Sequence, residues 1–147
     1  MTGERRWRRP GVIPAVVAFV LAIPGMLFLT FVGLWVGFEG GGTYAIRALI
    51  TWLVASSPML ALPASLVVGP SKRRLTLLGW ATALLLLESV ALIEAWGFLL
   101  APAALASAIA AWRVLRSAGS GWIALVLGGV VSLGSGVIAA TVWVLGE

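Results

Sequence analysis

Long runs of apolar residues constrain this chain more than any other feature of its sequence. The chain is 61% hydrophobic and only 10% charged, whereas a soluble domain carries about 25% charged residues. Residues 75–112 are almost wholly apolar, and a helix needs about 20 such residues to cross a bilayer. In lipid the backbone must satisfy its own hydrogen bonds, so runs of this kind fold as helices. The sequence therefore predicts an all-α integral membrane protein.

Turn residues divide the apolar runs into five predicted spans. Three consecutive glycines at 40–42 end the first run, and a basic turn at 70–74 separates the second from the third. Within the longest stretch, Glu94 and Gly97 form the natural break, because a charge and a glycine are suited to ending a helix. We predict a single domain, a bundle of five transmembrane helices with short loops, at approximately 12–37, 45–69, 75–94, 98–115 and 122–145.

The basic residues predict how this bundle is oriented. The first run is longer than the core of a signal peptide, which is about 7–15 residues, so we expect an uncleaved span. With a cytoplasmic N-terminus, nine of the ten basic residues lie inside and only Arg47 lies outside. The chain is therefore expected in the cell membrane, with its C-terminus outside. The nine inner residues are Arg5, Arg6, Arg8, Arg9, Lys72, Arg73, Arg74, Arg113 and Arg116.

The residue types that are missing exclude many kinds of chemistry. The sequence has no Cys, His, Asp, Asn or Gln. Zinc sites, c-type haem attachment, iron–sulfur clusters and nucleophile–His pairs all need residues from this set. We therefore predict no metal site, no cofactor and no enzymatic activity. The net charge of +5 would suggest nucleic acid in a soluble protein, but here the basic clusters flank apolar runs. The expected partner is the lipid bilayer, not nucleic acid.

One acidic residue, Glu88, lies deep inside a predicted span. Counted from Leu75, it is about 20 Å into a hydrocarbon core of about 30 Å. A carboxyl group at this depth is costly and is treated as a functional hypothesis. We expect Glu88 to face the bundle interior and to donate a hydrogen bond, in its protonated form, to a serine or to the carbonyl of Val54, which Pro58 leaves without a donor. The serines at similar depth are Ser56, Ser57, Ser132 and Ser135.

Two further patterns suggest contacts between helices. The last span has a small residue at every fourth position, a pattern that lets helices approach closely. This face packs within the chain, where the fourth span is the natural neighbour, or it forms a homo-oligomer or binds another membrane protein. Arg47 and Glu94 form a candidate ion pair at the outer boundary, or they are two solvated charges. The small residues are Ala124, Gly128, Ser132, Gly136 and Ala140.

These observations leave more than one function open. The first hypothesis is a non-enzymatic accessory or interaction protein of the membrane. The alternative is a small proton- or cation-coupled transporter or channel that uses Glu88. A third hypothesis, a membrane-permeabilising protein, agrees with the size of the chain, but no specific sequence feature supports it. Trp52 and Trp80 lie deep in their spans and are expected to serve in packing.

Overall fold

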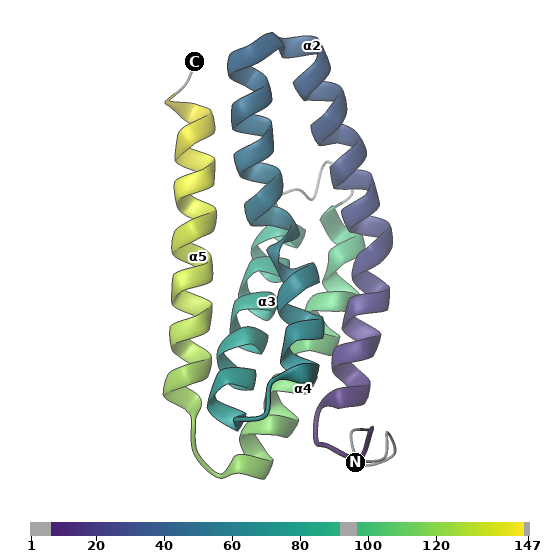
Figure 1. The fold of residues 1–147 in the computed structure, drawn as a ribbon, viewed down its shortest axis with the longest axis vertical. Coiled ribbons are helices and arrows are strands. Elements are labelled where there is room, and N and C mark those ends of the chain that lie inside the picture. Colours follow the sequence, from purple (N-terminus) through teal and green to yellow (C-terminus); the bar gives the residue numbers. More distant parts are fainter. Residues whose placement is uncertain (1–6, 92–96, 146–147) are drawn as a thin grey trace.

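The computed structural model describes residues 7–91 and 97–145. Within these residues the chain is helical and contains no strand, which confirms the predicted all-α class. Figure 1 shows the helices side by side along one long axis, with the first described residues at one end of the bundle and the last at the other. The elements are α2 (Val12–Val67), α3 (Ser71–Ala91), the short 3-10 helix η2 (Gly97–Leu100), α4 (Ala101–Ala118) and α5 (Trp122–Val144).

Four helices in the described part of the chain are long and apolar enough to cross a membrane. The number differs from the five predicted because α2 continues through the first two predicted spans in one element of 56 residues. Its backbone leaves the helical conformation at Gly41, with φ 76° and ψ −172°, and the chain folds back there (Figure 1). A positive φ suits glycine, which has no Cβ. We call residues 12–40 the first arm of α2 and residues 42–67 the second arm.

Helix boundaries also differ from the prediction at the other turns. The third predicted span, 75–94, begins earlier, at Ser71, so the basic residues assigned to a turn lie in the first turn of α3. The fourth predicted span, 98–115, continues to Ala118, where Gly119 in the left-handed conformation (φ 68°) ends α4. Part of the predicted break at Glu94 lies outside the described residues.

The core lies toward the N-terminal end of the bundle, where α2, α3, η2 and α4 meet. Alanine and leucine fill it, and small alanine side chains let the helix backbones approach closely. Toward the opposite end, which we call the Gly41 end, the bundle is open: between residues 27 and 50 only Ala48 is buried. Buried core residues include Ala15, Ala18, Ala22, Leu62, Leu78, Leu85, Leu100, Ala103 and Ala110.

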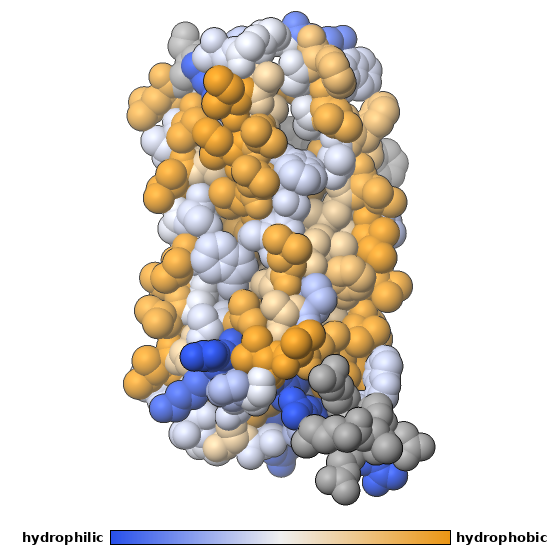
Figure 2. Space-filling view, viewed as in Figure 1, coloured by the Kyte–Doolittle hydropathy of each residue, from blue (hydrophilic) through white to orange (hydrophobic). Residues whose placement is uncertain are grey.

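The outer surface is apolar over most of its height. Figure 2 shows hydrophobic side chains covering much of the visible face, while hydrophilic side chains gather mainly at the N-terminal end. Large hydrophobic residues such as Phe31, Leu60, Leu105 and Val130 are 61–75% exposed. This surface is compatible with a lipid environment, as predicted for a membrane protein.

Helix α5 packs against α3 and the second arm of α2, so its predicted pairing with the fourth span is wrong. Helix α3 lies between α4 and α5 and packs against both. The short α4–α5 connection contains two glycines of positive φ, Gly119 and Gly121. These conformations turn the chain past α4, so that neighbours in sequence are not neighbours in packing.

Candidate functional site

Glu88 is buried in the bundle, and its carboxyl group has no partner among the described residues. Its side chain is 6% exposed, so it faces protein. Both carboxyl oxygens are buried and make no hydrogen bond to any described residue. The predicted hydrogen bond to a serine or to the carbonyl of Val54 is therefore wrong. An unpaired buried polar group is costly in an apolar surrounding, and Glu88 is thus a candidate site.

The four serines predicted to accompany Glu88 use their hydroxyl groups elsewhere. Ser56 donates to the carbonyl of Leu53 (3.3 Å), Ser57 to that of Val54 (2.7 Å) and Ser135 to that of Ser132 (2.7 Å). Serines in helices commonly bond to a carbonyl one turn earlier, so these three groups are satisfied within their own helices. Ser132 reaches another helix and donates to the carbonyl of Trp80 at 2.9 Å.

Tryptophans and hydroxyl residues make the polar contacts between the helices. An indole N–H buried in an apolar surrounding needs an acceptor, so a tryptophan deep in a span is a sequence signal for such a contact. The prediction that Trp52 and Trp80 serve in packing did not include these hydrogen bonds. The bonds are Trp52 Nε1 to Thr30 Oγ1 (2.9 Å), Trp80 Nε1 to Ser57 Oγ (2.7 Å), Trp143 Nε1 to Thr51 Oγ1, and Thr82 Oγ1 with Ser107 Oγ (2.7 Å).

Arg74 belongs to the interior, although its sequence neighbours mark it as part of a surface turn. It is 6% exposed, and its Nε donates to the carbonyl of Ser65 (3.0 Å) while its Nη2 donates to that of Pro10 (2.9 Å). It therefore links the two ends of α2 to α3. Arg74 shares helical register with a buried stripe that ends at Glu88, and this 3.6-residue periodicity is the signal that locates it. The stripe is Arg74, Leu78, Ala81, Leu85 and Glu88.

The small-residue face of α5 meets α3. A Cβ on Gly128 would lie 2.1 Å from the carbonyl oxygen of Thr76, so the two backbones are in direct contact. Gly136 faces the end of the Leu87 side chain, and Ala124 packs against the core. At the end of the face Ala139 is buried in place of Ala140, because a spacing of four drifts around a helix of 3.6 residues per turn.

The candidate outer ion pair cannot be followed to its acidic member, because Glu94 lies outside the described residues. Arg47 is half-buried, and its guanidinium carbon lies 5.6 Å from the centre of the Tyr44 ring. At this distance the cation interacts favourably with the aromatic face.

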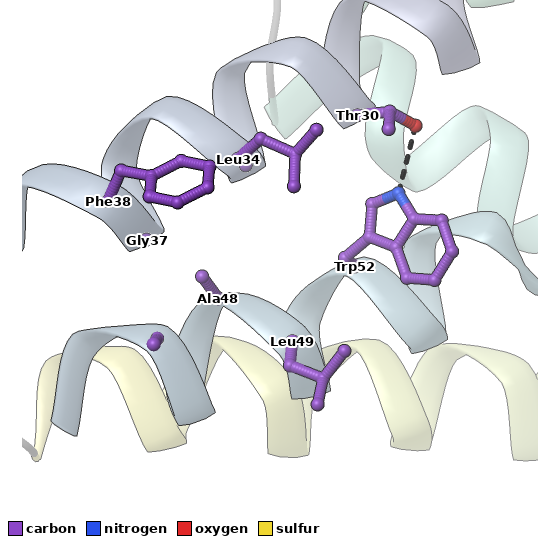
Figure 3. Close-up of a pocket in the computed structure, with 9 residues that line it drawn as sticks. Thr30, Leu34, Gly37, Phe38, Ala48, Leu49 and Trp52 are labelled. Carbon is purple, nitrogen blue, oxygen red and sulfur yellow. Dashed lines mark hydrogen bonds between the residues drawn. The ribbon is translucent and has the colours of Figure 1, made fainter. Parts of the chain in front are cut away.

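A groove that the sequence analysis did not identify runs between the two arms of α2 toward the Gly41 end; we call it the outer groove (Figure 3). Its volume is about 490 Å³. Gly33 and Gly37 form a G-x-x-x-G pattern on one wall, which is the sequence signal that could have indicated it. Trp52 donates to Thr30 at its inner end. The lining residues are Thr30, Gly33, Leu34, Gly37, Phe38, Ala45, Ala48, Leu49 and Trp52.

Comparisons with known proteins do not assign the chain to a class. No family model, no curated protein and no solved structure matches it. The function is therefore argued from the geometry of Glu88 and the outer groove.

Proposed function

We propose that this chain is a five-pass protein of the cell membrane with a cytoplasmic N-terminus and an outer C-terminus. The fold-back at Gly41 supports this count, because it makes the 56 residues of α2 two spans of about 20 residues or more. The basic residues at the N-terminal end support the orientation. Those in the described part of the chain are Arg8, Arg9, Lys72, Arg73, Arg74, Arg113 and Arg116.

Reporter insertions test this topology. A reporter inserted after Gly41 or at the C-terminus is expected to read outside, and one inserted after Gly119 or at the N-terminus to read inside. The measurement is the paired activity of a reporter active only in the cytoplasm and one active only outside it. Termini that read on the same side would overturn the five-pass arrangement.

The proposed role is that of a non-enzymatic interaction protein that receives a transmembrane helix of another membrane protein in the outer groove. The observation that carries the proposal is the open Gly41 end of the bundle. Figure 1 shows the turn of α2 and the last turns of α5 above the ends of α3 and α4. The arms of α2 thus extend past the helices that cover them elsewhere. Leu34, Phe38 and Leu49 are 54–85% exposed there.

The chemistry of the groove suits an apolar helix. Gly33, Gly37, Ala45 and Ala48 in its walls allow the close approach on which helix association in membranes depends. The polar pair of Trp52 and Thr30 is already satisfied, so the groove makes no demand for a polar ligand at that point.

Symmetry favours a different protein over a second copy of this chain. A closed homodimer places the same patch against itself, and two concave grooves facing each other leave a void between them. A groove that instead received an outer face of a second copy would make a head-to-tail contact, which generates rings or open chains. A partner helix of another protein fills the groove without either consequence.

Photo-crosslinking in native membranes tests the proposal. A photoreactive residue replacing Leu34 or Leu49 is expected to form an adduct with one and the same integral membrane protein. The matched control is Val137 on α5, which is 60% exposed and is expected to give lipid adducts only. Gly37→Leu places a large side chain in the groove and is expected to abolish the protein adduct. The fold is expected to tolerate the change, since a Cβ there makes only ordinary contacts of 3.9 Å.

The identified protein is then purified and mixed with this chain in detergent. Binding to the wild type and not to Gly37→Leu supports the proposal. Lipid adducts alone from both groove positions would show that acyl chains occupy the groove. Adducts at twice the mass of 15.3 kDa would show a second copy, and either result would overturn the partner helix.

A second candidate function, proton- or cation-coupled transport, is favoured by one observation. The carboxyl group of Glu88 is buried and unpartnered among the described residues. Such a group can exchange a proton or a cation in place of a fixed hydrogen bond. Substitutions that separate this role from a purely structural one are argued below.

A further inference from the structure

A pocket at the N-terminal end of the bundle carries concentrated positive charge. It has a volume of about 550 Å³ and lies between the chain that enters α2 and the last turns of α4. Three arginines line it, and none of the described residues that line it is acidic. The lining residues are Trp7, Arg8, Arg9, Pro10, Gly11, Ile13, Pro14 and Arg113.

Two contacts fix the walls of this basic pocket. Gly11 has φ 79°, and a Cβ on it would lie 2.7 Å from the carbonyl oxygen of Ala110. The chain entering α2 is therefore in close contact with α4, one helical turn before Arg113. On the other side, Arg74 donates to the carbonyl of Pro10. These backbone contacts hold the segment that carries Arg8 and Arg9 close to the turn of α4 that carries Arg113.

The positive charge has no counter-charge among the described residues of this end. The only acidic residues in the described part of the chain are Glu39 and Glu88. Glu39 lies beside the Gly41 turn at the opposite end, and Glu88 is buried in the bundle. At the first turn of α2, the N–H of Val12 donates to the carbonyl of Arg9 (3.3 Å) and Pro14 has no N–H. The positive end of the helix dipole is therefore what this turn adds to the positive potential. Within the described residues this charge is left unbalanced, and an anion from outside the chain can balance it.

We propose that the basic pocket binds the phosphate-bearing headgroup of an anionic phospholipid. Arginine binds phosphate oxygens through two parallel hydrogen bonds, which makes a group of three arginines suited to this ligand. Trp7 and Ile13 line the same pocket and are each 60% exposed. Tryptophan prefers the level of the headgroups, and Ile13 offers an apolar surface to the upper part of an acyl chain. The pocket therefore fits a lipid better than a free phosphate ion.

The test measures how tightly the full chain holds anionic lipid. The protein, purified in a neutral detergent, is titrated with phosphatidylglycerol and bound lipid is counted by native mass spectrometry. Each basic residue contributes about a factor of five to association with an anionic membrane surface, so Arg8→Gln/Arg9→Gln/Arg113→Gln is expected to lower the affinity about 100-fold. The matched control, Lys72→Gln/Arg73→Gln/Arg116→Gln, removes the same charge at the same end outside the pocket and is expected to keep near wild-type affinity.

Two further measurements can overturn the proposal. The single variant Arg8→Gln changes an exposed residue, so it is expected to leave the fold intact. It is expected to weaken lipid binding about five-fold. An equal loss in both triple variants would show diffuse attraction without a site and overturn the proposal. Inorganic phosphate at the same concentration is expected not to displace the lipid. Displacement by phosphate would assign the pocket to the free ion instead.

Discussion

Replacing Gly128 by alanine is expected to separate α5 from α3. A single Cβ there would lie 2.1 Å from the carbonyl oxygen of Thr76, and this atom belongs to the backbone and cannot rotate away. Overpacking in a core usually costs about 1–3 kcal/mol, and we expect Gly128→Ala at or above the upper end of that range. The same contact exists in reverse at Gly79, whose Cβ would lie 2.2 Å from the carbonyl oxygen of Leu125.

A disulfide between α3 and α5 measures this separation directly. The chain has no native cysteine, and a Cβ on Gly129 would lie 3.6 Å from that of Ala83, within the range that a disulfide bridges. The pair Ala83→Cys/Gly129→Cys is expected to oxidise readily in the wild-type background and poorly with Gly128→Ala. Gly134→Ala is the control, because no atom lies within 4 Å of its Cβ. Equal oxidation in all three backgrounds would contradict the close packing.

Replacing Glu88 by leucine is expected to stabilise the bundle. The carboxyl group is buried without a partner among the described residues, and a buried unsatisfied polar group costs about 1–3 kcal/mol. Leucine removes that cost at a similar side-chain size. Glu88→Gln is the matched control, since it keeps the polar group and is expected to leave stability nearly unchanged. The measurement is the midpoint of thermal unfolding in a mild detergent.

The same two variants separate the candidate functions. If Glu88 is structural, both variants keep the groove-dependent binding described above and show no change in ion flux. If Glu88 carries a proton or cation, both variants lose flux in proteoliposomes, because neither side chain can exchange a proton. A strong loss of stability in Glu88→Leu would contradict an unpartnered carboxyl and indicate that the folded protein holds a bound cation there.

The sequence predicts the helices well and their pairing poorly. Hydropathy and turn residues locate the apolar segments, because a span must be long and must satisfy its own backbone. Side chains that face lipid and side chains that face protein are both apolar, so periodicity does not show which helix meets which. The small residues of α5 indicate the face that packs. Its partner, α3, depends on the single glycine Gly79 and on the direction of the Gly119–Gly121 turn, which no local pattern fixes.

The candidate site shows the same division. Counting residues places Glu88 at a depth where burial is expected, and the structure buries it. The lack of a partner for its carboxyl group could not be predicted, because sequence does not show that Ser57 donates to the carbonyl of Val54 within its own helix and that no serine hydroxyl among the described residues bonds to Glu88. The sequence places Arg74 in a turn, because three adjacent basic residues look alike. Only the helical register with Leu78 distinguishes the one that turns inward.

The fold-back at Gly41 has a consequence for how this protein is made. One residue outside the helical conformation separates the two arms of α2. The two arms are therefore expected to insert into the bilayer together. In the proposed orientation, the first arm is not expected to cross the membrane while the second stays folded on the cytoplasmic side, because no loop joins them. In the proposed topology we therefore expect the hairpin to enter as a single unit, with its glycine turn leading, and the groove between its arms to form before α3, α4 and α5 are synthesised.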